Sequence, residues 1–188
     1  MIAQGKEYAK SLGLTNLQFH LCDFDTLDLK KEGFKRAFDL VFVSLTPAVR
    51  SHSQLLKAME MSRGRCCCIS HLYRKNRLME QIMNEVFPEK AMRHENSGRW
   101  FYAAFNMLFL MGYKPETSYE PRHSEKQIVP DEEYLDFLME KMFLPDDRTA
   151  ANRNAVMTWL TDHTETDGTI TEITDSCHGR LLWEVTNQ

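Results

Sequence analysis

The segment FDLVFVSL, residues 38–45, is a nearly continuous run of apolar and β-branched side chains. A strand that meets water on one face alternates apolar and polar residues, whereas a strand covered on both faces does not. The run is therefore typical of a strand inside a parallel sheet. Neighbouring parallel strands need crossover connections, which are usually helices. The segment predicts an α/β fold.

The flanking segments supply further elements of such a sheet. Residues 51–63 carry apolar side chains at helical spacing and can form a crossover helix, and RCCCISHL, residues 65–72, forms another short buried strand. Residues 2–12 are predicted to form a helix, because Gly13 stands where helices commonly stop. The alternation in NLQFHLCDF, residues 16–24, predicts a strand that ends in an acidic turn.

The second half of the chain combines helical stripes with extended segments. Apolar residues at helical spacing predict helices near residues 78–86, 101–109, 135–142 and 151–160. YKPETSYEP, residues 113–121, is expected to be extended and to lie at an edge or in an irregular strand, since Pro115 cannot donate to a sheet ladder. Turn-forming residues divide residues 168–187 into two β-rich runs, which predicts a C-terminal antiparallel hairpin. We expect residues 1–188 to form a single domain.

The charge and hydropathy of the chain limit the classes of partner that it is expected to bind. The 23 basic and 27 acidic residues give a net charge of −4 without a large block of either sign, which disfavours nucleic acid as a ligand. No apolar stretch approaches the ~20 residues that cross a bilayer, and residues 1–14 lack the apolar run of a secretory signal. We therefore expect a cytoplasmic protein with a small-molecule substrate and no membrane contact. The oligomeric state stays open.

Cysteine and histidine are present without the spacing of a metal site. Cys66, Cys67 and Cys68 are adjacent, and side chains that alternate across a strand cannot all face one partner. We expect them to be buried small hydrophobes, with a reactive thiol as the alternative. The seven histidines show no ligand spacing, so no metal is expected.

Ligands of open parallel sheets bind beyond the carboxyl ends of the strands. Asp23 and Phe24 follow the first predicted strand, and Ser44 follows the second. A carboxylate such as that of Asp23 can accept hydrogen bonds from a ligand amine. On the residues alone a second interpretation stays open, in which Asp23 and Asp25 cap a turn.

A family resemblance extends these predictions. MIAQGKEYAKSLGLTNLQFHLCDFDTLDL followed by FDLVFVSLTPAV resembles the middle of a class I S-adenosylmethionine-dependent methyltransferase. The similarity rests on a Met-Ile-x-x-(Ala/Gly) helix, an Asn-Leu-x-Phe strand that ends in Cys-Asp, and a Phe-Asp-Leu-Val strand. It implies a Rossmann-like methyltransferase sheet of parallel strands and crossover helices, with a C-terminal antiparallel hairpin and inserted helices.

The resemblance also implies roles for individual residues. Asp23 would meet the adenine amino group of S-adenosylmethionine, and the backbone of Phe24 would meet the ring edge. Ser44, Leu45 and Thr46 would lie beside the methionine part of the cofactor and the methyl-transfer channel. His71, at the expected carboxyl end of its strand, is a substrate-side candidate. In this family the acid of a Phe-Asp-Leu-Val run begins its strand, so Asp39 is expected to be structural.

The sequence departs from the family at its glycines. The eight glycines are widely spaced, and none provides the glycine-rich turn that holds the cofactor. We therefore expect the N-terminal strand–helix–strand unit to be missing, the domain to be incomplete at its N-terminus, and the strand at residues 17–22 to lie at an exposed edge.

Two functions from different classes follow. The first is S-adenosylmethionine-dependent methyl transfer to a small-molecule acceptor. The alternative is a noncatalytic methyltransferase remnant, or a partner-dependent subunit that does not bind the cofactor on its own. We assign no catalytic residue, because positioning can supply much of the acceleration of an in-line methyl displacement. The basic segments RKNR, residues 74–77, and RHSEK, residues 122–126, are expected to be solvated surface.

Overall fold

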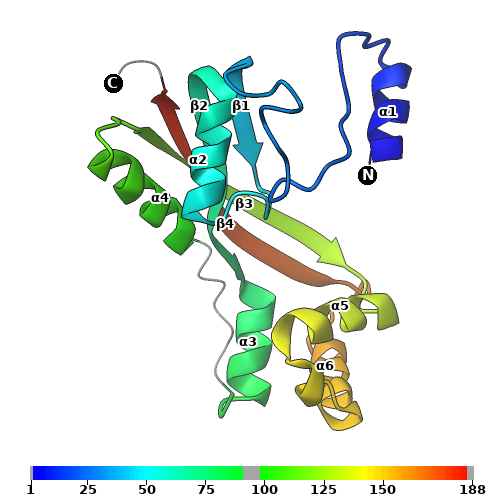
Figure 1. Ribbon diagram of the computed structural model, residues 1–188. Helices are drawn as coiled ribbons and strands as arrows, with labels where there is room; N and C mark the ends of the chain where they lie inside the picture. The colour runs from blue at the N-terminus through cyan, green and yellow to red at the C-terminus, as the bar shows by residue number, and fades with distance from the viewer. Residues whose placement is uncertain (1, 91–97, 186–188) are drawn as a thin grey trace.

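The computed structural model describes residues 2–90 and 98–185. The elements in chain order are α1 (Ile2–Ser11), β1 (Phe38–Ser44), α2 (His52–Met61), β2 (Ser62–Asn76), α3 (Arg77–Val86), α4 (Gly98–Leu110), β3 (Glu116–Ile128), α5 (Glu132–Met142), the 3-10 helix η1 (Pro145–Asp147), α6 (Ala150–Asp162) and β4 (Ile170–Glu184) (Figure 1). The predicted helices and the α/β class are confirmed.

One mixed sheet runs through the molecule in the order β1-β2-β4-β3. β1 and β2 are parallel, with Val41 opposite Cys66 and Val43 opposite Cys68. α2 connects them, as expected for a parallel pair. β4 lies between β2 and β3 and is antiparallel to both.

The prediction of a strand at residues 17–22 is wrong. This segment contains no regular strand, and the side chains of Leu17 and Leu21 are 50% and 91% exposed. Among the described strands, β1 pairs with β2 alone, so residues 17–22 do not join its other edge. A strand needs a partner for its backbone N–H and C=O groups, and alternation in sequence cannot supply one.

The prediction of a C-terminal antiparallel hairpin is also wrong. Residues 170–184 form one continuous strand, β4, and its antiparallel partner β3 precedes it across α5, η1 and α6. Gly179 lies inside the strand, and a side chain is excluded there because a Cβ atom would come within 2.7 Å of the Phe101 ring. β3 is confirmed as an edge strand, although it extends to Ile128, and Pro121 is accommodated there.

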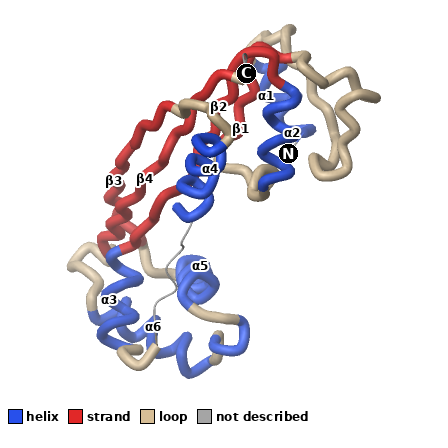
Figure 2. The backbone as a smooth tube through the Cα atoms, turned by 60° about the vertical axis from the view of Figure 1, so that its left-hand side comes forward, coloured by secondary structure: helices blue, strands red, loops and turns tan. Residues whose placement is uncertain are grey.

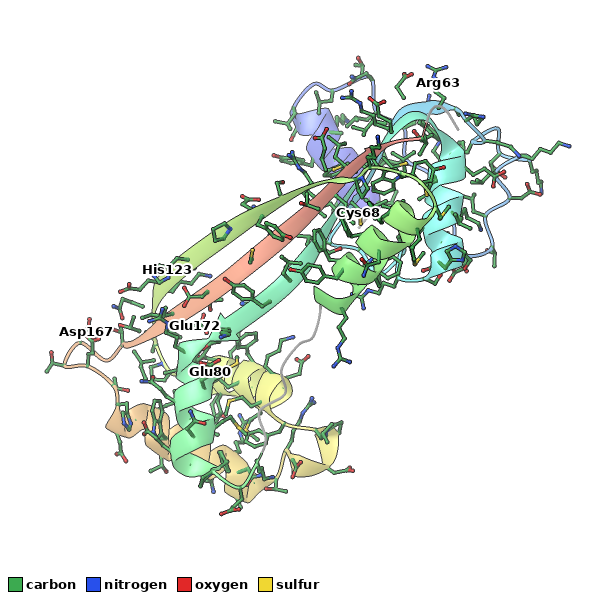
Figure 3. The ribbon with its side chains drawn as sticks, turned by 90° about the vertical axis from the view of Figure 1, so that its left-hand side faces the viewer. Arg63, Cys68, Glu80, His123, Asp167 and Glu172 are labelled. Carbon is green, nitrogen blue, oxygen red and sulfur yellow. The ribbon has the colours of Figure 1, made fainter. Side chains whose placement is uncertain are left out.

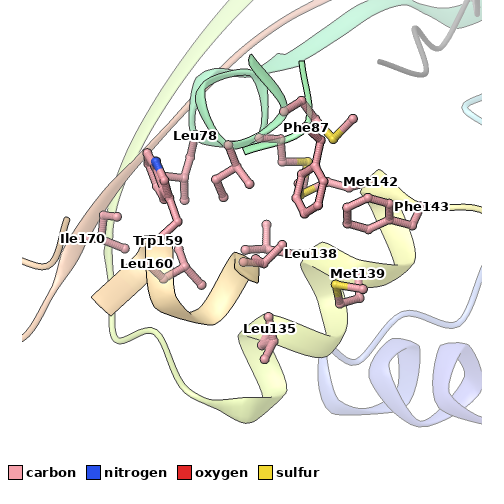
Figure 4. Packing of buried hydrophobic residues seen from close by; sticks show 14 residues of the cluster. Leu78, Phe87, Leu135, Leu138, Met139, Met142, Phe143, Trp159, Leu160 and Ile170 are labelled. Atoms are coloured by element: carbon pink, nitrogen blue, oxygen red, sulfur yellow. The ribbon is translucent and has the colours of Figure 1, made fainter. Parts of the chain in front are cut away.

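Two hydrophobic cores lie on opposite faces of β4. Leu181 belongs to a core with α2 and α4, and Ile170 belongs to a core with α3, α5 and α6. These two residues have opposite parity in a strand of regular register, so their side chains point to opposite faces. Figure 2 shows α3, α5 and α6 gathered at one end of the sheet, and Figure 4 shows their core, with Leu138 and Leu160 fully buried.

The cysteine triplet is buried, as the sequence predicts. Cys66, Cys67 and Cys68 are 2%, 7% and 4% exposed, and Cys177 is buried as well, whereas Cys22 is exposed. Burial raises the pKa of the Cys66 thiol to about 12 and also raises the pKa values of Cys67 and Cys68. Since the thiolate is the reactive form, these three thiols are both inaccessible and unreactive at neutral pH.

We therefore expect one of the five cysteines, Cys22, to react rapidly with a thiol reagent at neutral pH. The others should react only after unfolding. The measurement is the number of fast equivalents in a DTNB titration, with the modified residue identified by mass spectrometry. Cys22→Ser should abolish the fast phase, and rapid modification within the 66–68 triplet of the folded protein would contradict the assigned burial.

Candidate functional site

Two loops that the family resemblance assigns to the cofactor meet at the first turns of α2. This helix begins shortly after β1 ends, with Ser51 as its N-cap, so its N-terminal turns lie near the carboxyl end of β1. Oε1 of Gln54 accepts a hydrogen bond from the backbone N–H of Arg50 at 2.8 Å, and Nε2 of Gln54 donates to Oδ1 of Asp25 at 2.5 Å. One side chain thus joins the loop after β1 to the loop that contains residues 23–27.

Lys57 fixes the second loop more tightly. Its Nζ donates to the backbone oxygens of Phe24 at 2.9 Å, Asp25 at 2.7 Å and Leu27 at 3.1 Å. An ammonium group has three donors, and all three are used. Nζ also lies 5.7 Å from the centroid of the Phe24 ring, close enough for a cation–π interaction.

Asp23 caps a turn in this loop. Its Oδ1 accepts a hydrogen bond from the backbone N–H of Asp25 at 3.0 Å, and the residue is exposed. Phe24 is half-buried, with its side chain against the core of α2 and α4. Its backbone N–H has no hydrogen bond to any described residue. The turn and a ligand contact are compatible, because a carboxylate can accept several hydrogen bonds.

The loop after β1 contains a strained residue. Ser44 is the last residue of β1, and the backbone N–H of Leu45 continues the ladder with a 3.0 Å hydrogen bond to the oxygen of Ile69. Leu45 has φ of +48°, a left-handed conformation that costs a non-glycine residue about 1–3 kcal/mol. Oγ1 of Thr46 then accepts from the backbone N–H of Ala48 at 3.2 Å. Such strain clusters at binding and catalytic sites.

His71 does not lie at a strand end, which corrects the expectation from sequence. β2 continues to Asn76 because its second half pairs with β4. The His71 ring lies 4.5 Å from the ring of His178, centroid to centroid, on the neighbouring strand. Burial of His178, followed by the effect of His71, lowers the pKa of His178.

Asp39 lies near the start of β1, as the resemblance implies for a structural acid. Its carboxylate accepts two hydrogen bonds from the guanidinium of Arg63, at 2.7 and 3.0 Å. These bonds lower the pKa of the Asp39 carboxyl. The pair is exposed and ties β1 to the start of β2, in keeping with the expected structural role.

Sequence reasoning missed Gln54 and Lys57. They are polar residues in a helix assigned as a crossover, and their partners in the loop at residues 23–27 are about 30 positions upstream. Across residues 2–90 and 98–185, no three His, Cys, Asp or Glu side chains gather as a metal site. None of the helices in the same ranges is long and apolar enough to cross a membrane.

Comparison of the sequence with models of known protein families gives no match, and a search of curated proteins gives none. The geometry at α2 and the resemblance of the motifs therefore carry the functional interpretation.

We expect Lys57→Met to release the loop at residues 23–27, because the substitution removes all three side-chain donors that hold its carbonyl groups. Hydrogen–deuterium exchange at backbone amides of residues 22–30 should accelerate several-fold, while exchange in α5 and α6 stays unchanged. Lys141→Met, in which the replaced lysine lies exposed on α5, is the matched control. Equal exchange in the two variants would show that Lys57 does not anchor the loop.

Proposed function

We propose that this chain forms one side of an S-adenosylmethionine site and takes part in methyl transfer to a small-molecule acceptor. The observation that carries the proposal is the junction at α2, where Gln54 connects the loop after β1 to Asp25. In open α/β sheets, ligands bind at such carboxyl ends of parallel strands. The parallel pair β1–β2 with its crossover α2 gives further support.

Each loop would have its own task at this site. The Asp23 carboxylate would accept from the adenine amino group while it keeps its turn, and the free N–H of Phe24 would donate to the ring edge. The segment Ser44–Leu45–Thr46 would line the methionine part and the methyl channel. Binding and orientation of the two reactants would supply the acceleration, so the proposal requires no dedicated base.

The sequence has no glycine-rich turn, and we propose that the opposite side of the pocket comes from residues outside it. Each hydrogen bond that is absent from the site removes about 1 kcal/mol of binding free energy. Loss of one pocket wall also leaves the cofactor largely exposed to water. The chain by itself should therefore bind the cofactor weakly.

We expect S-adenosylhomocysteine to bind this chain with a dissociation constant of about 1 mM or weaker, which is worth about 4 kcal/mol or less. In an NMR titration the amide shifts should move at residues 23–24 and 44–46. Asp23→Ala should weaken binding by about 1–3 kcal/mol, the cost of leaving a donor unpaired. Asp28→Ala is the matched control, because Asp28 also caps a turn, through its bonds to the amides of residues 30 and 31.

Equal losses in the Asp23 and Asp28 variants would show that Asp23 acts only through its turn. Shifts confined to residues outside the two loops would contradict the proposed site. Micromolar affinity would contradict the proposal that the site is one-sided.

The edge of β1 favours the second candidate, a partner-dependent subunit. Val41 and Val43 pack against the core of α2 and α4, whereas Leu40 and Phe42 on the other face are 52% and 58% exposed. The same strand also has an edge without a strand neighbour among the described residues. An unpaired edge beside exposed apolar side chains is a template for pairing with another chain.

We expect the double variant Leu40→Lys, Phe42→Lys to self-associate less than the parent chain, because charges on an edge strand oppose pairing. Sedimentation velocity over a concentration series measures the change. Phe109→Lys is the control, since Phe109 is 63% exposed but lies on α4. An unchanged distribution for the double variant would remove β1 as the association surface.

A further inference from the structure

A cleft of about 830 Å³ lies away from the α2 loops, where the distal part of β2 meets β4 and β3. Its lining includes Tyr73, Lys75, Arg77, Arg122, His123 and Asp175. Its size falls within the ~300–1,000 Å³ typical of small-molecule pockets. Figure 3 shows His123 and the neighbouring strands from this side.

The topology of the sheet assembles the cleft from two distant basic segments. Lys75 on β2 is in register with Asp175 on β4, and Asp175 is in register with His123 on β3. Residues in register on adjacent strands share one face of the sheet. The segments RKNR and RHSEK, expected to be separate pieces of solvated surface, are therefore brought together because β4 is inserted between them.

Asp175 holds the side chains of Arg77 and His123 in place. Its Oδ2 accepts from Nε and Nη2 of Arg77 at 3.0 and 2.8 Å, and its Oδ1 is 2.7 Å from Nδ1 of His123. The contacts with His123 and Arg77 lower the pKa of the Asp175 carboxyl, so it stays ionised at neutral pH. The carboxylate thus orders two side chains across the sheet.

Positive charge nevertheless exceeds negative charge in the lining. The ammonium of Lys75 and the guanidinium of Arg77 oppose the single carboxylate of Asp175. The Lys75 ammonium has no ion pair or side-chain hydrogen bond with any described residue. Arg122 is in register with Ser176 and Arg74, so its side chain lies on the opposite face of the sheet from Lys75, where it pairs with Glu120 at 2.9 Å. Lys75 can therefore serve an incoming anion.

The lining also has an apolar component. Tyr73 is 42% exposed and, together with Pro121, borders the cleft beside the cations. Aromatic and proline side chains provide a surface for an apolar or planar body, while lysine and arginine provide charge-assisted hydrogen bonds to carboxylate or phosphate. A ligand that uses both parts has an anionic group attached to an apolar body.

We propose that this cleft binds a small organic anion, a carboxylate or phosphate on an apolar or aromatic body. Lys75 holds the anionic group, and Tyr73 and Pro121 contact the body. The site lies apart from the proposed cofactor loops, since Tyr73 is about 13 Å along β2 from Ile69, the partner of Ser44, at about 3.3 Å per residue. Binding here does not depend on methyl transfer.

The test is a titration of the whole chain with phenyl phosphate and with benzoate, which separates the two anionic groups. Benzamide serves as a neutral analogue and inorganic phosphate as an anion without an apolar body. Amide shifts at residues 73–77, 121–123 and 175–176 report the site. Either phenyl phosphate or benzoate should bind there, benzamide should not, and inorganic phosphate should bind more weakly.

Lys75→Gln should weaken binding of the anionic probe by about fivefold, as expected for a partly exposed charged contact. Lys126→Gln is the matched control, because Lys126 is an exposed lysine on β3 outside the cleft lining. Circular dichroism verifies that the variants fold.

Several results would overturn the proposal. One is binding of benzamide as tight as that of the anionic probes, and another is an equal effect of the Lys75 and Lys126 variants. A third is the absence of amide shifts at these residues with either anionic probe at about 10 mM, a concentration at which even a binding free energy of only about 3 kcal/mol is detected. Equal affinity for inorganic phosphate would remove Tyr73 and Pro121 as part of the site.

Discussion

The hydrogen-bonded insertion of β4 between β2 and β3 is the constraint on which most of the structure depends. β4 satisfies its backbone groups on both edges, and its alternate side chains enter two different cores, with Leu181 in one and Ile170 in the other. The helices at the two ends of the sheet are therefore held by one strand. The same insertion places Lys75 and His123 in one row with Asp175 and so creates the cationic cleft.

α2 has a comparable role at the other end of the sheet. Its apolar face, with Leu55 1% exposed, packs into a core, while Gln54 and Lys57 are free to hold the loop that carries Asp23 and Phe24. This division of faces follows from helical periodicity, since residues three apart point to neighbouring directions. A crossover helix that is required by the parallel pair thereby also positions two loops at the carboxyl end of β1.

The proposed cofactor loops and the proposed anion cleft lie at different levels of the same sheet. The first site rests on backbone groups, a turn carboxylate and the strained Leu45, whereas the second rests on side-chain charges beside Tyr73. The two sites suit ligands of different chemistry, because backbone groups can bind a neutral ring edge and exposed cations can bind an anion. A chain with both features can hold two ligands of different character on one sheet.

The sequence by itself determined the features that depend on local periodicity. These are the α/β class, the apolar strand β1 with its crossover α2, the helices α1, α3, α4, α5 and α6, and the burial of the cysteine triplet. A side-chain pattern with a period of 3.6, or an unbroken apolar run, reflects burial at each position and can be recognised without knowledge of the fold.

Only the tertiary structure decided which extended segments pair. Alternation predicted a strand at residues 17–22, but the segment has no strand neighbour, and turn-forming residues predicted a hairpin where β4 is continuous. The Arg77–Asp175–His123 cluster and the contacts of Lys57 were likewise invisible in the sequence. Their partners are about 30 to 100 residues apart, and hydrogen bonds between strands or from a helix to a distant loop leave no periodic trace in either segment.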